Sequence, residues 1–247
     1  FGTFKLLSEN EISDITAYLH TLTTPVKAPA ALSEETRGVW VAGADLTRAD
    51  IYLEQGAQLF HQAGHNNKSC ASCHSAGGGG PDLKGVAATY PRWHARHERI
   101  ILLEQRINMC RMHHMDSKPY PLGSAESNVL LSYMKYLSRD VPLRVATDGQ
   151  AASAIDRGKQ SFYRHTGQLN FACASCHAPD QPVVGKWLRG DVTQSMLAGG
   201  LYQTLAAQWP KHFIGGHDLG LQSLQQRIEH CQAVTRALPL KLGAEEY

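Results

Sequence analysis

The sequence lacks the features that two large classes of protein require. None of its 247 residues lies in a stretch approaching the run of about 18 apolar residues that a transmembrane helix needs. Its 24 Lys and Arg nearly balance its 22 Asp and Glu, and no basic run forms the electrostatic footprint of a nucleic-acid binder. We therefore expect no membrane span and no nucleic-acid partner.

The six cysteines could form three disulfides in an exported protein, but their spacing argues against this. Four of them lie in two Cys-Ala-Ser-Cys-His motifs, at residues 70–74 and 173–177. Such a pair can form thioethers with the haem vinyl groups, and the adjacent His can bind the iron. Zinc would need a further Cys/His pair at tetrahedral spacing, and no clean set remains. The motifs predict two covalent haem c groups, attached through Cys70, Cys73, Cys173 and Cys176 and bound at iron by His74 and His177.

Each haem motif begins a longer repeat. Tyr-Pro-Arg at 90–92 and Gln-Arg-Ile-Asn-Met-Cys at 105–110 follow the first motif, and Trp-Pro-Lys at 209–211 and Gln-Arg-Ile-Glu-His-Cys at 226–231 follow the second. A Pro-Leu segment that leads to Gly, Ala and Glu ends both copies. This pattern predicts duplication of a whole domain. We expect a mainly α fold of two tandem class I cytochrome c-like domains, residues 31–145 and 146–247.

Apolar periodicity predicts the helices of these domains. They are expected at residues 48–60, 100–110, 128–137, 155–165 and 219–231, with a flexible loop at 77–80 and a linker at 141–150. In the second copy Cys231 lies 55 residues after Cys176, whereas in the first Cys110 lies 37 residues after Cys73. A longer insert is where a duplicated domain could acquire a binding site, which favours the second domain as the catalytic one.

The first thirty residues differ from the repeat. Ser8 and Glu11 form a capping box ahead of an amphipathic helix over residues 12–22, and a Pro/Ala-rich connector follows. Two interpretations remain: residues 1–30 are the tail of an upstream single-haem cytochrome c, or they form a helix that packs on the first domain. The chain has no initiator Met, and residues 243–247 resemble the start of a helix, so we expect a processed or truncated chain whose second domain is incomplete at its C-terminal end.

Cys110 and Cys231 occupy equivalent places in the repeat. They could be buried apolar cysteines, they could pair with each other, or each could be the distal iron ligand of its own domain. Several rivals surround the first of them: Met109, Met112, His113, His114 and Met115. None of these rivals recurs in the second copy, so the repeat favours ligation by cysteine.

A thiolate ligand favours Fe(III) and lowers the reduction potential, and its sulfur can take part in exchange with other sulfur compounds. Arg227 lies four residues before Cys231, which places it on the same helical face one turn away. Its guanidinium fork suits an oxyanion such as a sulfonate, and it suits a haem propionate equally well. Arg106 has the same spacing in the first copy.

These motifs resemble those of the SoxA family, the dihaem subunits of the SoxAX cytochrome complex. The resemblance covers about residues 45–247 and is most specific in the two Gln-Arg-Ile-x-x-Cys segments. It implies a periplasmic L-cysteine S-thiosulfotransferase that joins thiosulfate to a cysteine of the carrier SoxYZ and passes two electrons to a c-type cytochrome. A location outside the cytoplasm also agrees with covalent haem attachment, which takes place there in bacteria.

The resemblance also implies the roles of single residues. Cys231 would be the active-site iron ligand, commonly modified to a persulfide, with Arg227 as the catalytic arginine and His177 as the proximal ligand. The first haem, held by His74 and Cys110, would lie too far away for the chemistry. Residues 1–30 would resemble the last helix of SoxX, the single-haem partner, although no SoxX haem motif is present. The alternatives are a thiosulfate dehydrogenase that forms tetrathionate and a plain dihaem electron carrier.

Overall fold

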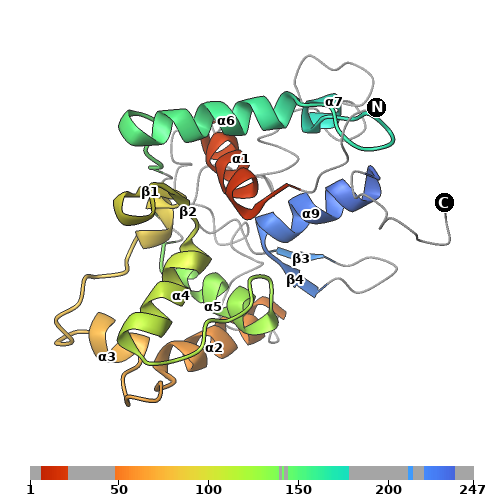
Figure 1. Ribbon diagram of the computed structural model, residues 1–247. Helices are drawn as coiled ribbons and strands as arrows, with labels where there is room; N and C mark the ends of the chain where they lie inside the picture. Colours follow the sequence, from red (N-terminus) through yellow and green to blue (C-terminus); the bar gives the residue numbers. More distant parts are fainter. Residues whose placement is uncertain are drawn as a thin grey trace, which may run out of the picture.

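The computed structural model shows a mostly helical chain (Figure 1) and describes residues 7–21, 48–138, 141, 144–177, 211–213 and 220–236. The side chains of Cys176, His177, Arg227 and Cys231 lie outside this description. The elements are α1 (Glu9–Thr21), α2 (Arg48–His61), α3 (Cys70–His74), η1 (Val86–Thr89), β1 (Arg92–His94), η2 (Ala95–His97), β2 (Arg99–Ile101), α4 (Leu103–His114), α5 (Ala125–Tyr136), η3 (Gly149–Ala151), α6 (Ala152–Tyr163), α7 (Cys173–His177), β3 (Lys211–Phe213), β4 (Gly220–Gln222) and α9 (Leu224–Val234). The expected mainly α class is confirmed. No helix in the described ranges is long and apolar enough to span a membrane.

The same order of elements occurs twice along the chain. A long helix, a short haem-motif helix, a two-stranded hairpin and a second long helix follow one another as α2, α3, β1–β2 and α4, and again as α6, α7, β3–β4 and α9. Both hairpins are antiparallel, with Arg92 opposite Ile101 in one and Lys211 opposite Gln222 in the other. The sequence did not predict these strands, because three residues are too few to show an alternating pattern.

The hairpins also correct two predicted helix boundaries. The helices expected from residues 100 and 219 begin at Leu103 and Leu224, after strands β2 and β4. Each begins with the same cap: the Oε1 atom of Gln105 accepts the backbone N–H of Leu102 at 2.9 Å, and that of Gln226 accepts the backbone N–H of Ser223 at 2.9 Å. The arginine and the cysteine of the repeated motif therefore lie at the same helical positions in α4 and α9.

Helix α1 packs mainly on the second copy of the repeat, where it crosses α6 and contacts α9 (Figure 1). The expected capping box is confirmed, since the backbone N–H of Ser8 donates to the Glu11 carboxylate at 2.8 Å and Glu11 N–H donates to Ser8 Oγ at 3.2 Å. Ile15 and Leu19 of α1 are fully buried against Phe162 of α6. The first copy contributes a smaller contact through β2. Descent of residues 1–30 from an upstream domain stays a prediction.

The packing of α1 on α6 repeats the packing of α5 on α2. The rings of Phe60 on α2 and Tyr133 on α5 lie 5.4 Å apart between centroids, and the rings of Phe162 on α6 and Tyr18 on α1 lie 5.5 Å apart. A buried glycine, Gly56 in α2 or Gly158 in α6, lies against the backbone of the crossing helix in each pair. Helix α1 therefore occupies on α6 the place that α5 occupies on α2.

Candidate functional site

The first haem motif forms the helix α3, whose histidine is held in one orientation. Ser69 caps the helix, since its Oγ accepts the backbone N–H of Ser72 at 3.0 Å. The Nδ1 atom of His74 lies 2.9 Å from the carbonyl oxygen of Pro81. Because a carbonyl can only accept, Nδ1 carries the proton, and Nε2 keeps a lone pair for a metal. A histidine that binds iron commonly has this arrangement, in which one ring nitrogen donates to a carbonyl and the other is left for the metal.

The glycine-rich segment after the motif packs on it. Gly80 donates its backbone N–H to the carbonyl oxygen of Cys73 at 2.8 Å. A Cβ atom at Gly78 or Gly80 would overlap that same carbonyl oxygen. The sequence predicted only a flexible loop here, whereas the structure shows that these glycines let the backbone close over α3 and bring Pro81 to His74.

The third cysteine of the first copy lies beside the motif. Cys110, on α4, is partly buried and close enough to Cys70 and Cys73 for their thiols to influence one another electrostatically. Burial is the largest cause that raises the pKa of Cys110, and Cys73 adds to it while Arg106 opposes it. None of the three thiols forms a disulfide. An iron ion at Cys110 would deprotonate its thiol, since a coordinating thiol binds as the thiolate.

The neighbouring methionines and histidines differ in their surroundings. Met112 is 43% exposed, and His113 and His114 are exposed as well. Met115 is buried, with its sulfur 3.9 Å from the sulfur of Cys70, and Met109 packs against the core of the first copy. The structure thus places Cys110 close to the motif cysteines and exposes three of its five rivals to solvent, whereas ligation of iron by Cys110 stays a prediction.

The second haem motif forms the helix α7 with matching local geometry. Ala172 N–H donates to Ser175 Oγ at 3.0 Å, as Ser69 N–H donates to Ser72 Oγ at 3.0 Å in the first motif. Cys173 is partly buried and packs against the core that α1, α6 and α9 share.

The remaining predicted residues of the second site are placed only by their backbone. Cys176 and His177 lie in α7, and Arg227 and Cys231 lie in α9, at the positions that match Arg106 and Cys110 in α4. Their side chains lie outside the described part of the chain, so their contacts stay a prediction.

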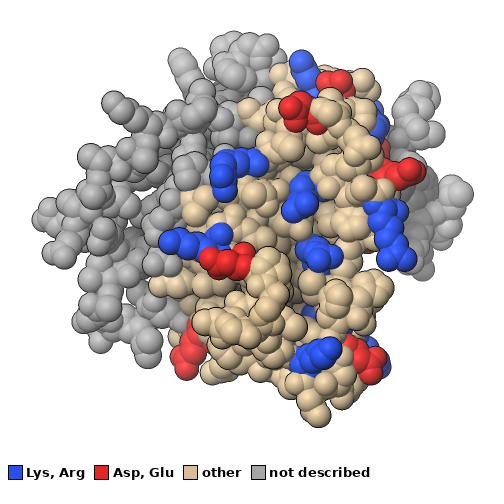
Figure 2. Space-filling model, turned by 90° about the vertical axis from the view of Figure 1, so that its left-hand side faces the viewer, with Lys and Arg blue, Asp and Glu red and all other residues tan. Residues whose placement is uncertain are grey.

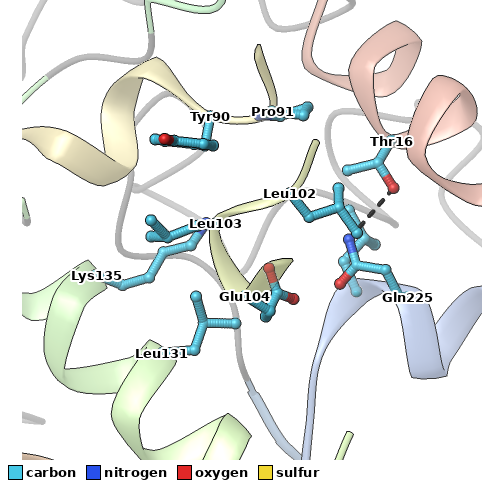
Figure 3. A pocket seen from close by; sticks show the side chains of 10 residues that line it. Thr16, Tyr90, Pro91, Leu102, Leu103, Glu104, Leu131, Lys135 and Gln225 are labelled. Carbon is cyan, nitrogen blue, oxygen red and sulfur yellow. Dashed lines mark hydrogen bonds between the residues drawn. The ribbon is translucent and has the colours of Figure 1, made fainter. Parts of the chain in front are cut away.

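A small cavity between the two copies lies apart from both motifs. Its volume is about 30 Å³, and Thr16, Glu104, Lys135 and Gln225 reach it from α1, α4, α5 and α9 (Figure 3). Burial raises the pKa of the Glu104 carboxyl and lowers the pKa of Lys135, although each charge favours the other. A space of this size holds about one water molecule and no substrate. Sequence analysis missed this buried acid and base, because the helices that carry them meet only in the folded chain.

The described residues of the first motif fit a c-type haem. The thiols of Cys70 and Cys73 are free to form thioether bonds, and the Pro81 carbonyl orients His74. Cys110 lies close to these thiols on a different helix. Within the ranges that the structure describes, no three His, Cys, Asp or Glu side chains form a separate metal-binding cluster. This donor set is that of a haem protein and differs from the tetrahedral set of a structural zinc site.

Comparison with known proteins agrees with this chemistry. Residues 55–143 match the family described as SoxA/TsdA, cytochrome c domain. That range begins within α2, runs past the end of α5 and includes the first haem motif and Cys110. The segment is therefore a c-type cytochrome domain, a class that binds haem c covalently.

Similar proteins point to one group of c-type cytochromes, the SoxA subunits. The chain is 35% identical over 199 residues to the L-cysteine S-thiosulfotransferase subunit SoxA of Pseudaminobacter salicylatoxidans, a match that covers 79% of this chain and 64% of the relative. It is 27% identical over 241 residues to the SoxA subunit of Rhodovulum sulfidophilum, covering 92% and 78%. The crystal structure of SoxXA from P. pantotrophus matches with a TM-score of 0.61 at 26% identity, over 86% of this chain and 74% of that one. The expected resemblance to SoxA is confirmed.

Proposed function

We propose that this chain is a SoxA-like c-type cytochrome that joins thiosulfate oxidatively to a cysteine of a carrier protein. The observation that carries the proposal is the closeness of Cys110 to both motif thiols, because the Gln-Arg-Ile-x-x-Cys motif that places Cys110 recurs in the second copy and ends there at Cys231. SoxA relatives at 27–35% identity are named L-cysteine S-thiosulfotransferase subunits. The chain spans 64% of the length of the first of them, so the activity of the whole protein is part of the proposal.

The proposal includes two haem c groups in two tandem domains, residues 31–145 and 146–247. The repeated order of helix, motif helix, hairpin and capped helix supports it. Cys70, Cys73, Cys173 and Cys176 would bind the haems covalently, with His74 and Cys110 as iron ligands in the first domain and His177 and Cys231 in the second.

The haem of the second domain supplies an electron acceptor next to the sulfur chemistry. Cys231, as thiolate or persulfide, holds the reacting sulfur there, and the Arg227 guanidinium binds the sulfonate oxygens of thiosulfate through its planar fork. In the overall step, the carrier thiol loses its proton and its sulfur bonds to the outer sulfur of thiosulfate. The two electrons pass to the electron-accepting c-type cytochrome, so the product is a cysteine S-thiosulfonate on the carrier (protein-S-S-SO₃⁻).

The setting follows from the same chemistry. Covalent haem attachment takes place outside the bacterial cytoplasm, which supports a periplasmic location. The partners would be a SoxX-like single-haem cytochrome, either fused or separate, the carrier SoxYZ and an electron-accepting cytochrome c. The carrier must deliver its cysteine and leave again, so its complex with this chain is transient.

The experiment compares two matched cysteine substitutions in the haem-loaded protein with its SoxX-like partner. Cys231→Ala should abolish formation of the thiosulfate adduct on SoxYZ, whereas Cys110→Ala, the same change in the first copy, should leave most of it. Mass spectrometry of the carrier detects the adduct, and an intact mass of this chain detects extra sulfur on Cys231. Full activity of Cys231→Ala would leave the plain dihaem carrier as the better explanation.

A thiosulfate dehydrogenase is the second candidate, because the matched family joins TsdA with SoxA in its description. That reaction couples two thiosulfates to tetrathionate and needs no protein acceptor. Turnover of thiosulfate without SoxYZ, as fast as in its presence, would favour this alternative.

A further inference from the structure

A cavity of about 300 Å³ lies beside Cys110, and its walls are basic. It lies between the segment of β1 and η2 and one face of α4. The residues that line it include His94, Arg96, His97, Arg106, Met109 and His113. No Asp or Glu is among its lining residues. Figure 2 faces the side of the molecule on which β1, β2 and α4 lie in Figure 1, and Lys and Arg on that face are scattered among uncharged residues together with Asp and Glu.

The groups of this cavity lack an anionic partner in the described part of the chain. The Nδ1 atom of His94 is buried and has no hydrogen-bond partner. Burial lowers the pKa of His94, and the nearby His97, Arg106 and Arg92 lower it further. Arg106 is half-buried and also acts electrostatically on Tyr90 and Cys110. Cations gathered around a hollow without a carboxylate are suited to bind an anion.

The positions of Arg106 and Arg111 along α4 indicate which anion the cavity would bind. Arg111, just after Cys110, acts on the attachment cysteine Cys70, whereas Arg106, one turn before Cys110, acts on Tyr90 and His94. Cys70 marks the vinyl edge of a haem bound at the first motif. A haem attached there would carry its two propionates on the opposite edge of the macrocycle, away from Arg111, where Arg106 would be the nearer arginine of α4 to hold them.

We propose that Arg106 and His94 bind the propionates of the first haem and thereby set its reduction potential. This inference rests on the proposed attachment of a haem at Cys70 and Cys73. The guanidinium fork of Arg106 matches a carboxylate in two parallel hydrogen bonds, and His94 supplies a buried donor. The positive charge of Arg106 would stabilise the reduced, less positive iron. The arginine of the first Gln-Arg-Ile-x-x-Cys motif thus binds the haem propionates, whereas its counterpart Arg227 binds the sulfonate group of the substrate.

The test compares Arg106→Gln with Arg96→Gln in the haem-loaded protein. Both changes remove one positive charge from the cavity wall, but Arg96 is exposed and lies outside the interactions with Cys110 and Tyr90. Arg106→Gln should shift the midpoint potential of one haem to more negative values and make it depend on pH, because the released propionate now titrates. It should also shift the propionate bending band in resonance Raman spectra. Arg106→Lys should restore part of the potential and little of the Raman band.

Two results would overturn the inference. One is an equal shift of potential in Arg106→Gln and Arg96→Gln with unchanged Raman bands, which would show only a long-range effect of charge. The other is no shift in either variant. The proposed haem site is tested separately by counting covalent haems: if Cys70→Ser with Cys73→Ser kept the haem number of the unchanged chain, the attachment site itself would be wrong.

Discussion

Asn128 on α5 donates a hydrogen bond from Nδ2 to Gln226 Oε1 on α9 at 2.8 Å, between residues 98 positions apart. The same nitrogen donates to the Leu221 carbonyl at 2.7 Å, and Gln226 Nε2 donates to the Gly123 carbonyl at 2.9 Å. Gln226 also caps the start of α9. The helix that carries Arg227 is therefore positioned by a buried side chain of the first copy.

Asn128→Ala should lower the free energy of unfolding by about 1–3 kcal/mol, because it removes the side-chain donor to the Leu221 carbonyl and one of the two donors to Gln226 Oε1. Hydrogen exchange over residues 220–236 should become faster, and denaturant unfolding should show the lost stability. Ser132→Ala is the control, since its hydroxyl bonds only to a carbonyl of its own helix. Equal changes in the two variants would contradict the role of Asn128.

Contacts between residues far apart in the sequence, such as that of Asn128 with Gln226, could not be predicted, whereas local patterns could. The capping box at Ser8 and Glu11 and the helix beginning at Arg48 are local patterns, and they were predicted correctly. The place of α1 depends on Ile15 meeting Phe162, and no periodicity shows which distant apolar face a helix will cover. The three-residue strands were missed because they are shorter than any alternating pattern.

The residues of the candidate site were likewise predicted only in part. The repeat favoured Cys110 as the distal iron ligand of the first domain, and that role stays a prediction. The structure adds that its thiol lies close to those of Cys70 and Cys73. The carbonyl of Pro81 that orients His74 was missed, because every residue has a carbonyl group and the sequence does not show which one turns inward. A Gly-rich segment that leads to a proline after the motif was the available signal.

The two crossing helix pairs predict matched effects of glycine substitution. Alanine raises helix propensity by about 1 kcal/mol over glycine, but a Cβ at Gly56 would overlap the Val129 carbonyl, and one at Gly158 would overlap the Asp14 carbonyl. Each substitution should therefore destabilise the protein by about 1–3 kcal/mol. Hydrogen exchange should accelerate in residues 125–136 for Gly56→Ala and in residues 9–21 for Gly158→Ala.

The controls for this pair are alanines at exposed positions of the same helices, Gln58→Ala in α2 and Gln160→Ala in α6. They should change stability by less than about 0.5 kcal/mol. If Gly158→Ala accelerated exchange in α5 as strongly as in α1, its effect would not be confined to the helix pair that contains the substitution.

Two acids of α1 should respond to pH with opposite signs. Burial raises the pKa of Asp14 above its ordinary 3.8, although Arg157 Nε donates to it at 3.0 Å and favours its charge. The folded protein then binds this proton more tightly than the unfolded chain, so the free energy of unfolding falls as pH rises from 3.8 through the folded pKa. Asp14→Asn lacks this loss, and its stability relative to the unchanged protein should rise with pH across that window.

Glu11 provides the comparison. Although burial is the largest influence and acts upward, the bonds from Ser8 and Arg164 hold the pKa of Glu11 below 4.5. Its stabilisation is present above pH 4.5 and is lost as pH falls through the folded pKa. Glu11→Gln should therefore be less stable at neutral pH, by less than about 1 kcal/mol, and match the unchanged protein in acid. Thermal unfolding from pH 3 to pH 7 measures both profiles, and parallel profiles for the two variants would contradict the signs.

Gly80 lies in the loop that closes over α3 after the first haem motif. A Cβ atom at Gly80 would overlap the Cys73 carbonyl and come within 3.3 Å of His74 Nδ1, so Gly80→Ala must push the loop away from α3. The His74 bond to Pro81 should weaken, because the proline is the next residue in the loop. We expect a lower yield of covalent haem at this motif and a lower proximal ligand field, seen in the haem count and the electronic spectrum. Ser75→Ala, at an exposed position beside the motif, should change neither. If Gly80→Ala kept the full haem count and an unchanged spectrum, the Pro81 carbonyl would not be needed to orient His74.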